Sequence, residues 1–552
     1  PPLQQHSSCR LPRIDKRGPS VMELLIWVLA VIKNALCRIL DPFYWLLSKL
    51  ETTIPLQPIR NNILTMSASQ LAAKIRTGEI SCEEVMQRYI FRCRRVDMKL
   101  NAVVENRYAA AVEEAEKADA LIASNTKTVK ELEEELPLLG VPISVKECCK
   151  LKGMSYSVGC RFRVGKKADK DGTAVELLRR SGAIPLAVTN QPEMCLCTET
   201  NNLVCGLTRN PYNIQRTVGG ASGGEAALVS SAGTLAGIGC DLFGSVRCPA
   251  MFTSIYGHRP TPGIVSVEGH YPEESSEQLT DHLVLGPITR YSEDLPLMMR
   301  VMAGNQAAKL KLHQKVNLKD LRVYYMTETG SSLSLPPVEK EIKLAIQKAV
   351  DYLQTTCKCV QKADFAEFKN SQEISRAVLF NLKNIPDALN EAKHLNNKES
   401  PDLWNEILKS FIGQPAFSSM ALIHNFHVWI SKKLPAEKTQ LYICQNKNLK
   451  QNIIGTLGED GILIYPTYPT AAHYHHQTMI RKPADSYCMI ITSLGLPATN
   501  IPMGLNKKGL PIGFQVIAAP YQDRLCFAVA QELERAFGGW VQPPCLQTPT
   551  DS

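Results

Sequence analysis

The chain has 552 residues, of which 44% are hydrophobic and 21% charged, and its formal net charge is +9. This composition is near the globular average, so it allows a large buried core and excludes a wholly disordered chain. Part of the positive charge lies just before an apolar stretch, at Arg10, Arg13, Lys16 and Arg17. Since no basic run with interleaved aromatic residues occurs elsewhere, contact with anionic lipid headgroups is favoured over binding of nucleic acid.

Residues 21–50 are predicted to form a membrane anchor. Leu24 to Ile32 is an unbroken apolar run, but Lys33 ends it, and a helix that spans a bilayer needs about 20 mostly apolar residues. The anchor is therefore expected to be a marginal spanning helix or an interfacial one, the alternative being a buried helix docked on the domain. We expect the basic segment and anchor over residues 1–50, a linker over 51–66 and one large domain over 67–545.

The compartment is predicted from the cysteines. All 18 are scattered rather than arranged as a disulfide framework, and no Asn-x-Ser/Thr site occurs. Both features are typical of a domain kept under reducing conditions. We therefore expect an intracellular, membrane-associated protein, with the endoplasmic reticulum or the lipid-droplet surface as candidate locations.

Helices and strands alternate along the large domain. Ser81 and Glu84 match a capping box ahead of apolar residues at helical spacing. Residues 306–450 are more polar, mainly helical and without recognisable chemistry. The alternation predicts an α/β fold with a central, twisted, mixed β-sheet covered by helices on both faces. Further helices are predicted over residues 102–124, 172–181, 295–302 and 523–537, and strands over 136–145, 183–188, 461–465 and 512–517.

Lys146 follows an apolar strand directly, which is unusual because lysine is rarely enclosed. Desolvation is expected to lower its pKa and leave a neutral amine that can act as a base. The alternative is a lysine that reaches the surface at the end of the strand.

Two glycine-rich segments follow. Gly219 to Gly224 surrounds Ala221 and Ser222 with glycines, which permit unusual backbone angles and the close approach of a ligand; the alternative is a flexible turn. Further on, Ser245 follows a tight turn, so nearby amide groups can hold an oxyanion while its hydroxyl attacks a carbonyl. Asp241 and Arg247 are expected to pair and to fix this turn.

These segments, in this order, resemble the amidase-signature family, and within it the fatty-acid amide hydrolases. The resemblance runs from about residue 65 to Val541. It implies the amidase-signature fold and hydrolysis of the amide or ester bond of long-chain fatty-acid amides, with no cofactor and no metal. The segments that carry it are Lys146, Gly219–Gly224, Asp241–Pro249, Gly257–Gly263, Leu496–Ala498 and Phe537–Trp540.

The resemblance also implies a role for each site residue. Ser245 corresponds to the nucleophile that forms an acyl-enzyme, and Lys146 to the base. A bridging serine, usually in a cis peptide, passes the proton between them in the family, and its position here is Ala221. Leu242, Phe243 and Gly244 correspond to the oxyanion-binding and substrate-binding turn.

Two of these positions depart from the pattern. Ala221 has no hydroxyl to relay a proton, and losing such a group costs about 10²–10⁴ in rate, unless Ser222 or a water substitutes for it. Phe243 replaces a glycine, and its Cβ restricts the backbone angles that glycine allows. Its bulky ring can block the acyl group, and losing one oxyanion donor lowers the rate by about 10²–10³-fold. The alternative function is therefore a catalytically impaired protein of this fold that binds lipid or a protein partner. A homodimer is a further expectation.

Short motifs suggest two other kinds of site. Gly220 to Gly224 matches the Gly-x-Ser-x-Gly elbow of α/β-hydrolases, but the polar segment from Tyr212 to Thr217 does not predict the strand that this elbow needs. His473, His475 and His476 are close in sequence, but no further ligand follows at a suitable spacing, so a polar loop near the mouth of the site is favoured. Cys195 and Cys197 are interpreted as core or lining residues.

Overall fold

The structure is a computed structural model that describes residues 21–48, 55–273, 277–330, 335–382, 389, 392 and 401–545. The predicted basic cluster at residues 10–17 and residues 51–54 of the predicted linker lie outside these ranges. Within the described residues the helices are α1 (Val21–Ser48), α2 (Ala68–Arg76), α3 (Cys82–Leu100), α4 (Tyr108–Ala123), α5 (Val129–Glu135), α6 (Thr173–Arg180), α7 (Gly223–Ser230), α8 (Arg247–Phe252), α9 (Glu277–Thr280), α10 (Asp294–Ala303), α11 (Lys340–Thr356), α12 (Ser371–Leu379), α14 (Leu403–Phe411), α15 (Ser419–Ser431), α16 (Ala436–Leu457), α17 (Thr478–Arg481), α18 (Ser486–Ser493) and α19 (Asp523–Phe537).

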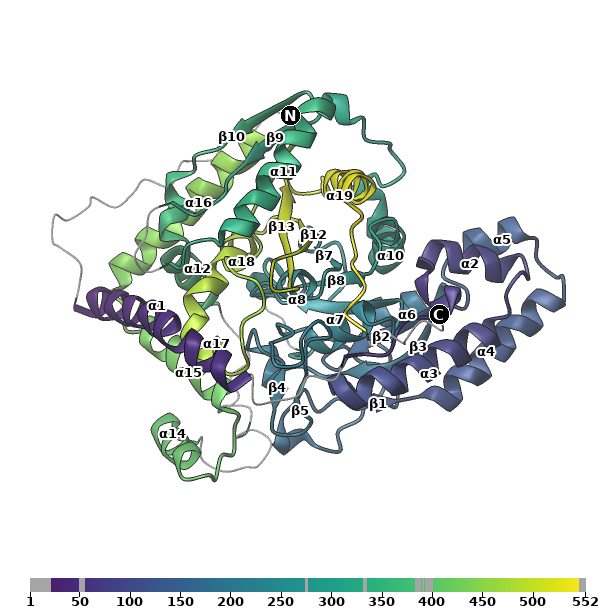
Figure 1. Ribbon diagram of the computed structural model, residues 1–552, viewed down its shortest axis with the longest axis horizontal. Helices are drawn as coiled ribbons and strands as arrows, with labels where there is room; N and C mark the ends of the chain where they lie inside the picture. Colours follow the sequence, from purple (N-terminus) through teal and green to yellow (C-terminus); the bar gives the residue numbers. More distant parts are fainter. Residues whose placement is uncertain are drawn as a thin grey trace, which may run out of the picture.

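Eleven of the described strands form one mixed sheet flanked by helices, in the order β1-β3-β2-β6-β8-β7-β12-β13-β11-β9-β10 (Figure 1). β4 and β5 form a separate two-stranded sheet. The predicted α/β fold is therefore confirmed. The strands are β1 (Val103–Asn106), β2 (Pro142–Lys146), β3 (Ile184–Thr189), β4 (Asn201–Asn202), β5 (Gly206–Leu207), β6 (Ala236–Asp241), β7 (Tyr256–Arg259), β8 (Val284–Thr289), β9 (Arg322–Tyr325), β10 (Cys359–Lys362), β11 (Gly461–Tyr465), β12 (Ala498–Leu505) and β13 (Pro511–Ala518).

The strands β3, β2 and β6 are adjacent and parallel, and they position the site. Val145 of β2 pairs with Ile238 of β6, so Lys146 at the end of β2 lies beside the last residues of β6. β2 is fully buried, as expected for a strand with neighbours on both edges. Ligands in α/β sheets bind at the carboxyl ends of such strands, which is the edge where these three end.

Several predicted boundaries need correction. The strand predicted over residues 136–145 occupies only Pro142–Lys146, because Gly140 has a φ of +72° and turns the chain before it. The helix predicted over residues 102–124 begins at Tyr108, since Val103–Asn106 pairs with β3 as β1. The helix after Ser81 is confirmed, and the Ser81 hydroxyl accepts a hydrogen bond from the Glu84 amide.

The predicted anchor forms helix α1, which lies against α15 and α17 (Figure 1). Asp41 accepts hydrogen bonds from Gln477 and Arg481, and Tyr44 stacks on Tyr474. No described helix has an apolar stretch long enough to cross a bilayer.

Candidate active site

Lys146 is fully buried at the end of β2. Its ammonium nitrogen donates a hydrogen bond to the Ser222 hydroxyl at 3.1 Å and lies 3.1 Å from the Cys240 sulfur. The side chain therefore does not reach the surface, and the enclosed lysine predicted from the sequence is the one observed.

The charge environment of Lys146 differs from the expectation. Burial lowers its pKa, but the thiols of Cys195, Cys240 and Cys148 raise it by more, so the pKa lies above its usual value. The predicted lowering by burial is therefore present but outweighed, because three sulfur atoms gather around this lysine and a sequence gives no sign of that.

The loop from Gly219 to Gly224 brings Ser222 to Lys146. Its peptide bond between Gly220 and Ala221 is cis, and the Ala221 side chain is fully buried. Ser222 precedes α7, and its amide donates to the Ser245 carbonyl at 3.2 Å. Gly239 lies beneath it, where an added Cβ would be 2.7 Å from the Ser222 hydroxyl. A glycine at position 239 is thus what lets Ser222 approach the end of β6.

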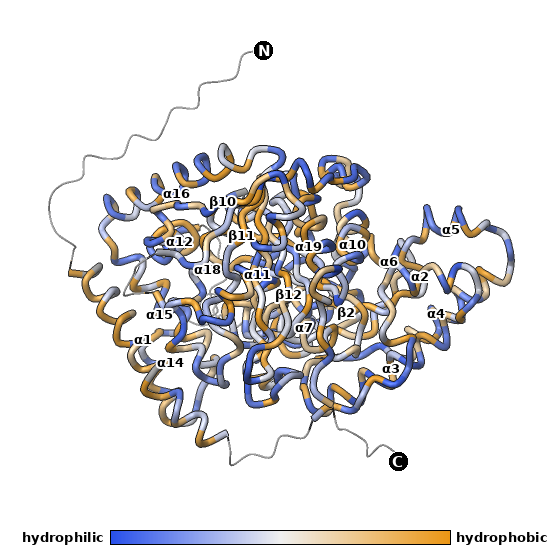
Figure 2. The backbone as a smooth tube through the Cα atoms, turned by 45° about the horizontal axis from the view of Figure 1, so that its top comes forward, coloured by the Kyte–Doolittle hydropathy of each residue, from blue (hydrophilic) through white to orange (hydrophobic). Residues whose placement is uncertain are grey.

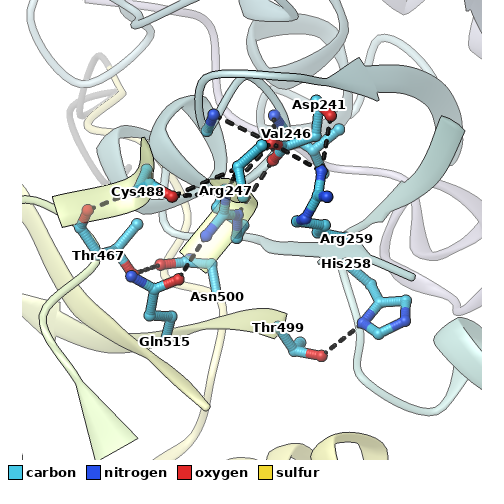
Figure 3. A network of polar contacts seen from close by, with 12 residues as sticks. Asp241, Val246, Arg247, His258, Arg259, Thr467, Cys488, Thr499, Asn500 and Gln515 are labelled. Carbon is cyan, nitrogen blue, oxygen red and sulfur yellow. Dashed lines mark hydrogen bonds and ion pairs between the residues drawn. The ribbon is translucent and has the colours of Figure 1, made fainter. Parts of the chain in front are cut away.

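The turn between β6 and α8 is held by a buried charge network (Figure 3). Both carboxylate oxygens of Asp241 accept from Arg247, at 3.0 and 3.1 Å, as the sequence predicted. Arg259 donates to the Asp241 carbonyl at 2.7 Å, and Arg247 also donates to Gln515 at 2.7 Å. Burial raises the pKa of Asp241, but Arg247 and Arg259 lower it by more, so the carboxylate stays ionised. A paired, buried carboxylate of this kind fixes the backbone around it.

The same carboxylate accepts from the amide of Gly244 at 3.0 Å and from that of Val246 at 3.3 Å. The Gly244 amide, predicted as an oxyanion donor, is therefore committed to Asp241. Among the described contacts, the amides of Leu242, Phe243 and Ser245 donate to no other group, so these three remain for an oxyanion. Gly244 has a φ of +95°, and an added Cβ would lie 2.2 Å from the Cys488 Cβ, so only glycine fits there.

Phe243 fits the backbone but fills space. The φ angle of Phe243 is not positive, so the position tolerates a Cβ. The expected backbone restriction therefore does not arise. Its ring is 5% exposed and packs against Phe380 and His424, with ring centroids 6.0 and 5.7 Å apart. These three rings form an aromatic cluster two residues before Ser245.

His424 in this cluster should make the fold acid-sensitive. Burial, followed by Lys482 and Arg376, lowers its pKa from 6.5 to about 3. Between these values the unfolded chain binds a proton that the folded chain does not, so stability is full above pH 6.5 and is lost as the pH falls toward 3. Relative to His424→Leu, the wild type should lose about 1.4 kcal/mol of unfolding free energy per pH unit in that window.

Thermal or denaturant unfolding of both proteins at several pH values measures this difference. His427, whose pKa is also lowered by burial, is present in both proteins, so most of its own contribution cancels. An identical acid dependence in the two proteins would contradict the assignment to His424.

Ser245 itself is 3% exposed and lies between the turn and α8. Within the described residues, no hydrogen bond joins its side chain to Lys146 or to Ser222. The structure thus gathers Lys146, Ala221, Ser222 and Ser245 at one edge of the sheet, but the hydrogen-bonded link from the lysine toward Ser245 stops at Ser222.

The rival sites are not formed. Tyr212 to Thr217 holds no strand beyond isolated bridges, so Ser222 lacks the strand of a hydrolase elbow. His473 and His475 point to different partners, Thr478 at 2.8 Å and Glu199 at 3.1 Å, rather than to one metal position.

The fold and this site define an amidase-signature hydrolase, and the Amidase family model matches residues 84–527. The chain belongs to this family. Fatty-acid amide hydrolase 2-A of Danio rerio is 39% identical over 492 residues, covering 88% of this chain and 92% of that protein. Fatty-acid amide hydrolase 2 of Homo sapiens is 37% identical over 497 residues, with 88% and 92% covered.

Solved structures agree with the fold. That of a fatty acid amide hydrolase has a TM-score of 0.67 at 22% identity and covers 97% of this chain and 93% of its own. That of 6-aminohexanoate cyclic dimer hydrolase with its substrate has a TM-score of 0.69 at 22% identity and covers 88% and 100%.

Proposed function

We propose that this amidase hydrolyses long-chain fatty-acid amides slowly, through an acyl-enzyme on Ser245 with Lys146 as the base. The observation that carries the proposal is the buried Lys146–Ser222 hydrogen bond at the edge where the turn of Ser245 begins. Two relatives, 39% and 37% identical, are fatty-acid amide hydrolases, which supports a lipid amide as the substrate.

In this mechanism the Ser245 hydroxyl attacks the amide carbonyl, and the amides of Leu242, Phe243 and Ser245 stabilise the oxyanion. The proton leaves toward the neutral form of Lys146, which its raised pKa makes a minor species, and the resulting ammonium then protonates the departing amine. Water then attacks the acyl-enzyme and gives up its proton toward Lys146, and the Ser245 oxygen is protonated as the fatty acid leaves. Because Ala221 supplies no hydroxyl, the proton must pass through Ser222 or a bridging water, and this is the step that makes turnover slow.

Labelling with a fluorophosphonate tests the nucleophile. Wild-type protein is expected to gain one adduct, read by intact mass and mapped to the peptide of Ser245. Ser245→Ala should lose it. Ser230→Ala, which removes a buried hydroxyl on α7 away from Lys146, is the control and should keep it. An adduct on Ser222 instead would sink the assignment.

The alternative function has its own outcome in this test. If neither the wild type nor Ala221→Ser is labelled, the chain is an amidase-fold protein that binds lipid amides or a partner without turnover. Labelling that appears only in Ala221→Ser would locate the loss of chemistry at one hydroxyl.

We further propose that the enzyme meets its substrate at a membrane surface through α1. Figure 2 shows apolar residues recurring along this helix, and those with large exposed fractions include Ile39 at 69%, Phe43 at 56% and Trp45 at 55%. On α14, which packs against α15, Phe411 is 83% exposed. An apolar surface of this kind on a helix that packs on the domain is typical of interfacial attachment.

Flotation with phosphatidylcholine–phosphatidylserine vesicles tests this attachment. The double variant Phe43→Glu/Trp45→Glu is expected to leave the vesicle fraction, because two carboxylates would have to enter the interface. Met98→Glu on α3, where Met98 is 79% exposed, is the matched control and should float like the wild type. Equal flotation of all three proteins would rule out α1 as the attachment.

A further inference from the structure

Three cysteines meet at the same sheet edge as Lys146. Cys195 follows β3, Cys148 follows β2, and Cys240 is the penultimate residue of β6. Since β3, β2 and β6 are neighbouring parallel strands, their carboxyl ends bring these residues together although they are distant in sequence. Cys148 and Cys240 are buried, and the Cys195 side chain is partly so.

A histidine completes the cluster. His270 lies in the loop between β7 and β8 and forms an isolated bridge with Cys149, while the Tyr271 amide donates to the Cys148 carbonyl at 2.9 Å. The His270 side chain is 3% exposed. Neither ring nitrogen has a hydrogen-bond partner among the described residues. A buried imidazole without partners costs free energy, so this ring lacks a ligand that it is placed to hold.

The distances suit a tetrahedral ion. The three sulfurs and one ring nitrogen of His270 all lie within 4.8 Å of one another. The Cys148 and Cys240 sulfurs are 3.8 Å apart. Two thiolates on tetrahedral zinc, each about 2.3 Å from the metal, are separated by about 3.8 Å. Small side-chain rotations would bring the other ligands to the same spacing.

We propose that Cys148, Cys195, Cys240 and His270 form a zinc site. Three thiolates and one imidazole are a common ligand set for structural zinc, and sulfur ligands disfavour the harder magnesium and calcium. With four protein ligands the site is closed and leaves no position for a water or a substrate, so its role is to tie the ends of three strands to the loop of His270. This inference goes beyond the proposed hydrolysis and does not depend on it.

The site also adjoins the catalytic edge. Cys240, a ligand, lies 3.1 Å from the Lys146 nitrogen, so the ion would fix the surroundings of the lysine without contacting the substrate. From the sequence no metal is expected, and Cys195 is interpreted as a core or lining residue, because the ligands come from four separate segments and show no short ligand spacing.

Zinc content of the full chain tests the proposal. Protein purified under a phosphine reductant, stripped and reloaded with zinc, then dialysed, is expected to hold an equimolar amount by elemental mass spectrometry. Loss of an outer-shell partner already weakens metal sites by about 10–100-fold, so His270→Ala and Cys195→Ala should weaken binding by at least about 100-fold. Cys197→Ala, a buried cysteine two positions along, is the control and should bind like the wild type.

Cobalt substitution gives a second reading that needs no variant. Co²⁺ in the wild-type protein should show thiolate-to-cobalt charge transfer and the strong visible bands of tetrahedral geometry. A wild-type protein that holds no zinc, or a cobalt spectrum without thiolate bands, would overturn the site. So would a loss of zinc binding in Cys197→Ala equal to that in Cys195→Ala. Fluorophosphonate labelling of the same samples reads Ser245 separately, so failure of the zinc site and failure of the proposed hydrolase are distinguishable.

Discussion

Replacing Ala221 with serine is expected to raise the rate of fatty-acid amide hydrolysis by about 10²–10⁴-fold, the contribution of a positioned proton-transfer group. The change adds one oxygen to a buried Cβ that follows the cis peptide bond, beside the residue that already accepts from Lys146. A hydroxyl at this position would extend the Lys146–Ser222 hydrogen bond toward Ser245, the proposed nucleophile. Steady-state turnover of a long-chain fatty-acid amide measures the gain in kcat.

The double variant Ala221→Ser/Ser245→Ala is the control, and it should return to background because the restored relay then has no nucleophile to serve. Adding Ser222→Ala to Ala221→Ser tests whether Ser222 shares the relay. An unchanged kcat in a folded Ala221→Ser protein, judged by its melting temperature, would mean that proton transfer does not limit turnover.

The segments proposed to carry this chemistry were predictable because each depends on local sequence. Lys146 after an apolar strand, the glycines around Ser222 and the Asp241–Arg247 pair all occur where the sequence placed them. The pair is separated by one turn of chain, so its contact follows from local geometry alone. Gly244, with its positive φ, marks the turn in the sequence as well as in the structure.

Features that depend on the sheet order were not predictable. β9 and β10 lie in a stretch read as helical, because both are short strands whose hydrogen bonds come from β11 and from each other, with β10 at the edge of the sheet. The raised pKa of Lys146 has the same origin, since Cys195 and Cys240 reach it only through the β3-β2-β6 order. A single sequence contains no record of which strands are neighbours, so neither contact could be read from it.

Phe243→Ala is expected to make hydrolysis of long-chain amides faster while leaving short-chain substrates nearly unchanged. The Phe243 ring is packed against Phe380 and His424 close to Ser245, so its removal frees apolar space for an acyl chain. One methylene in an apolar pocket decides about 10–200-fold in specificity, and the ring is larger, so kcat/KM for a long acyl chain should rise by at least that range. Because φ at this position is not positive, the oxyanion turn itself should be unaltered.

The same substitution should also lower the stability of the fold, so its effect on activity has to be separated from its effect on stability. Removing a buried phenylalanine ring typically destabilises a protein by about 3–5 kcal/mol, so activity must be compared below the lowered melting temperature. Phe243→Leu keeps an apolar side chain beside Phe380 and is the matched control, with a smaller cost and a smaller gain. An equal change in kcat/KM for acetyl and long-chain amides would mean that Phe243 acts on the reacting carbonyl rather than on the acyl chain. In that case the ring would be a barrier to all substrates, and the restored activity of Ala221→Ser would stay limited until both positions were changed.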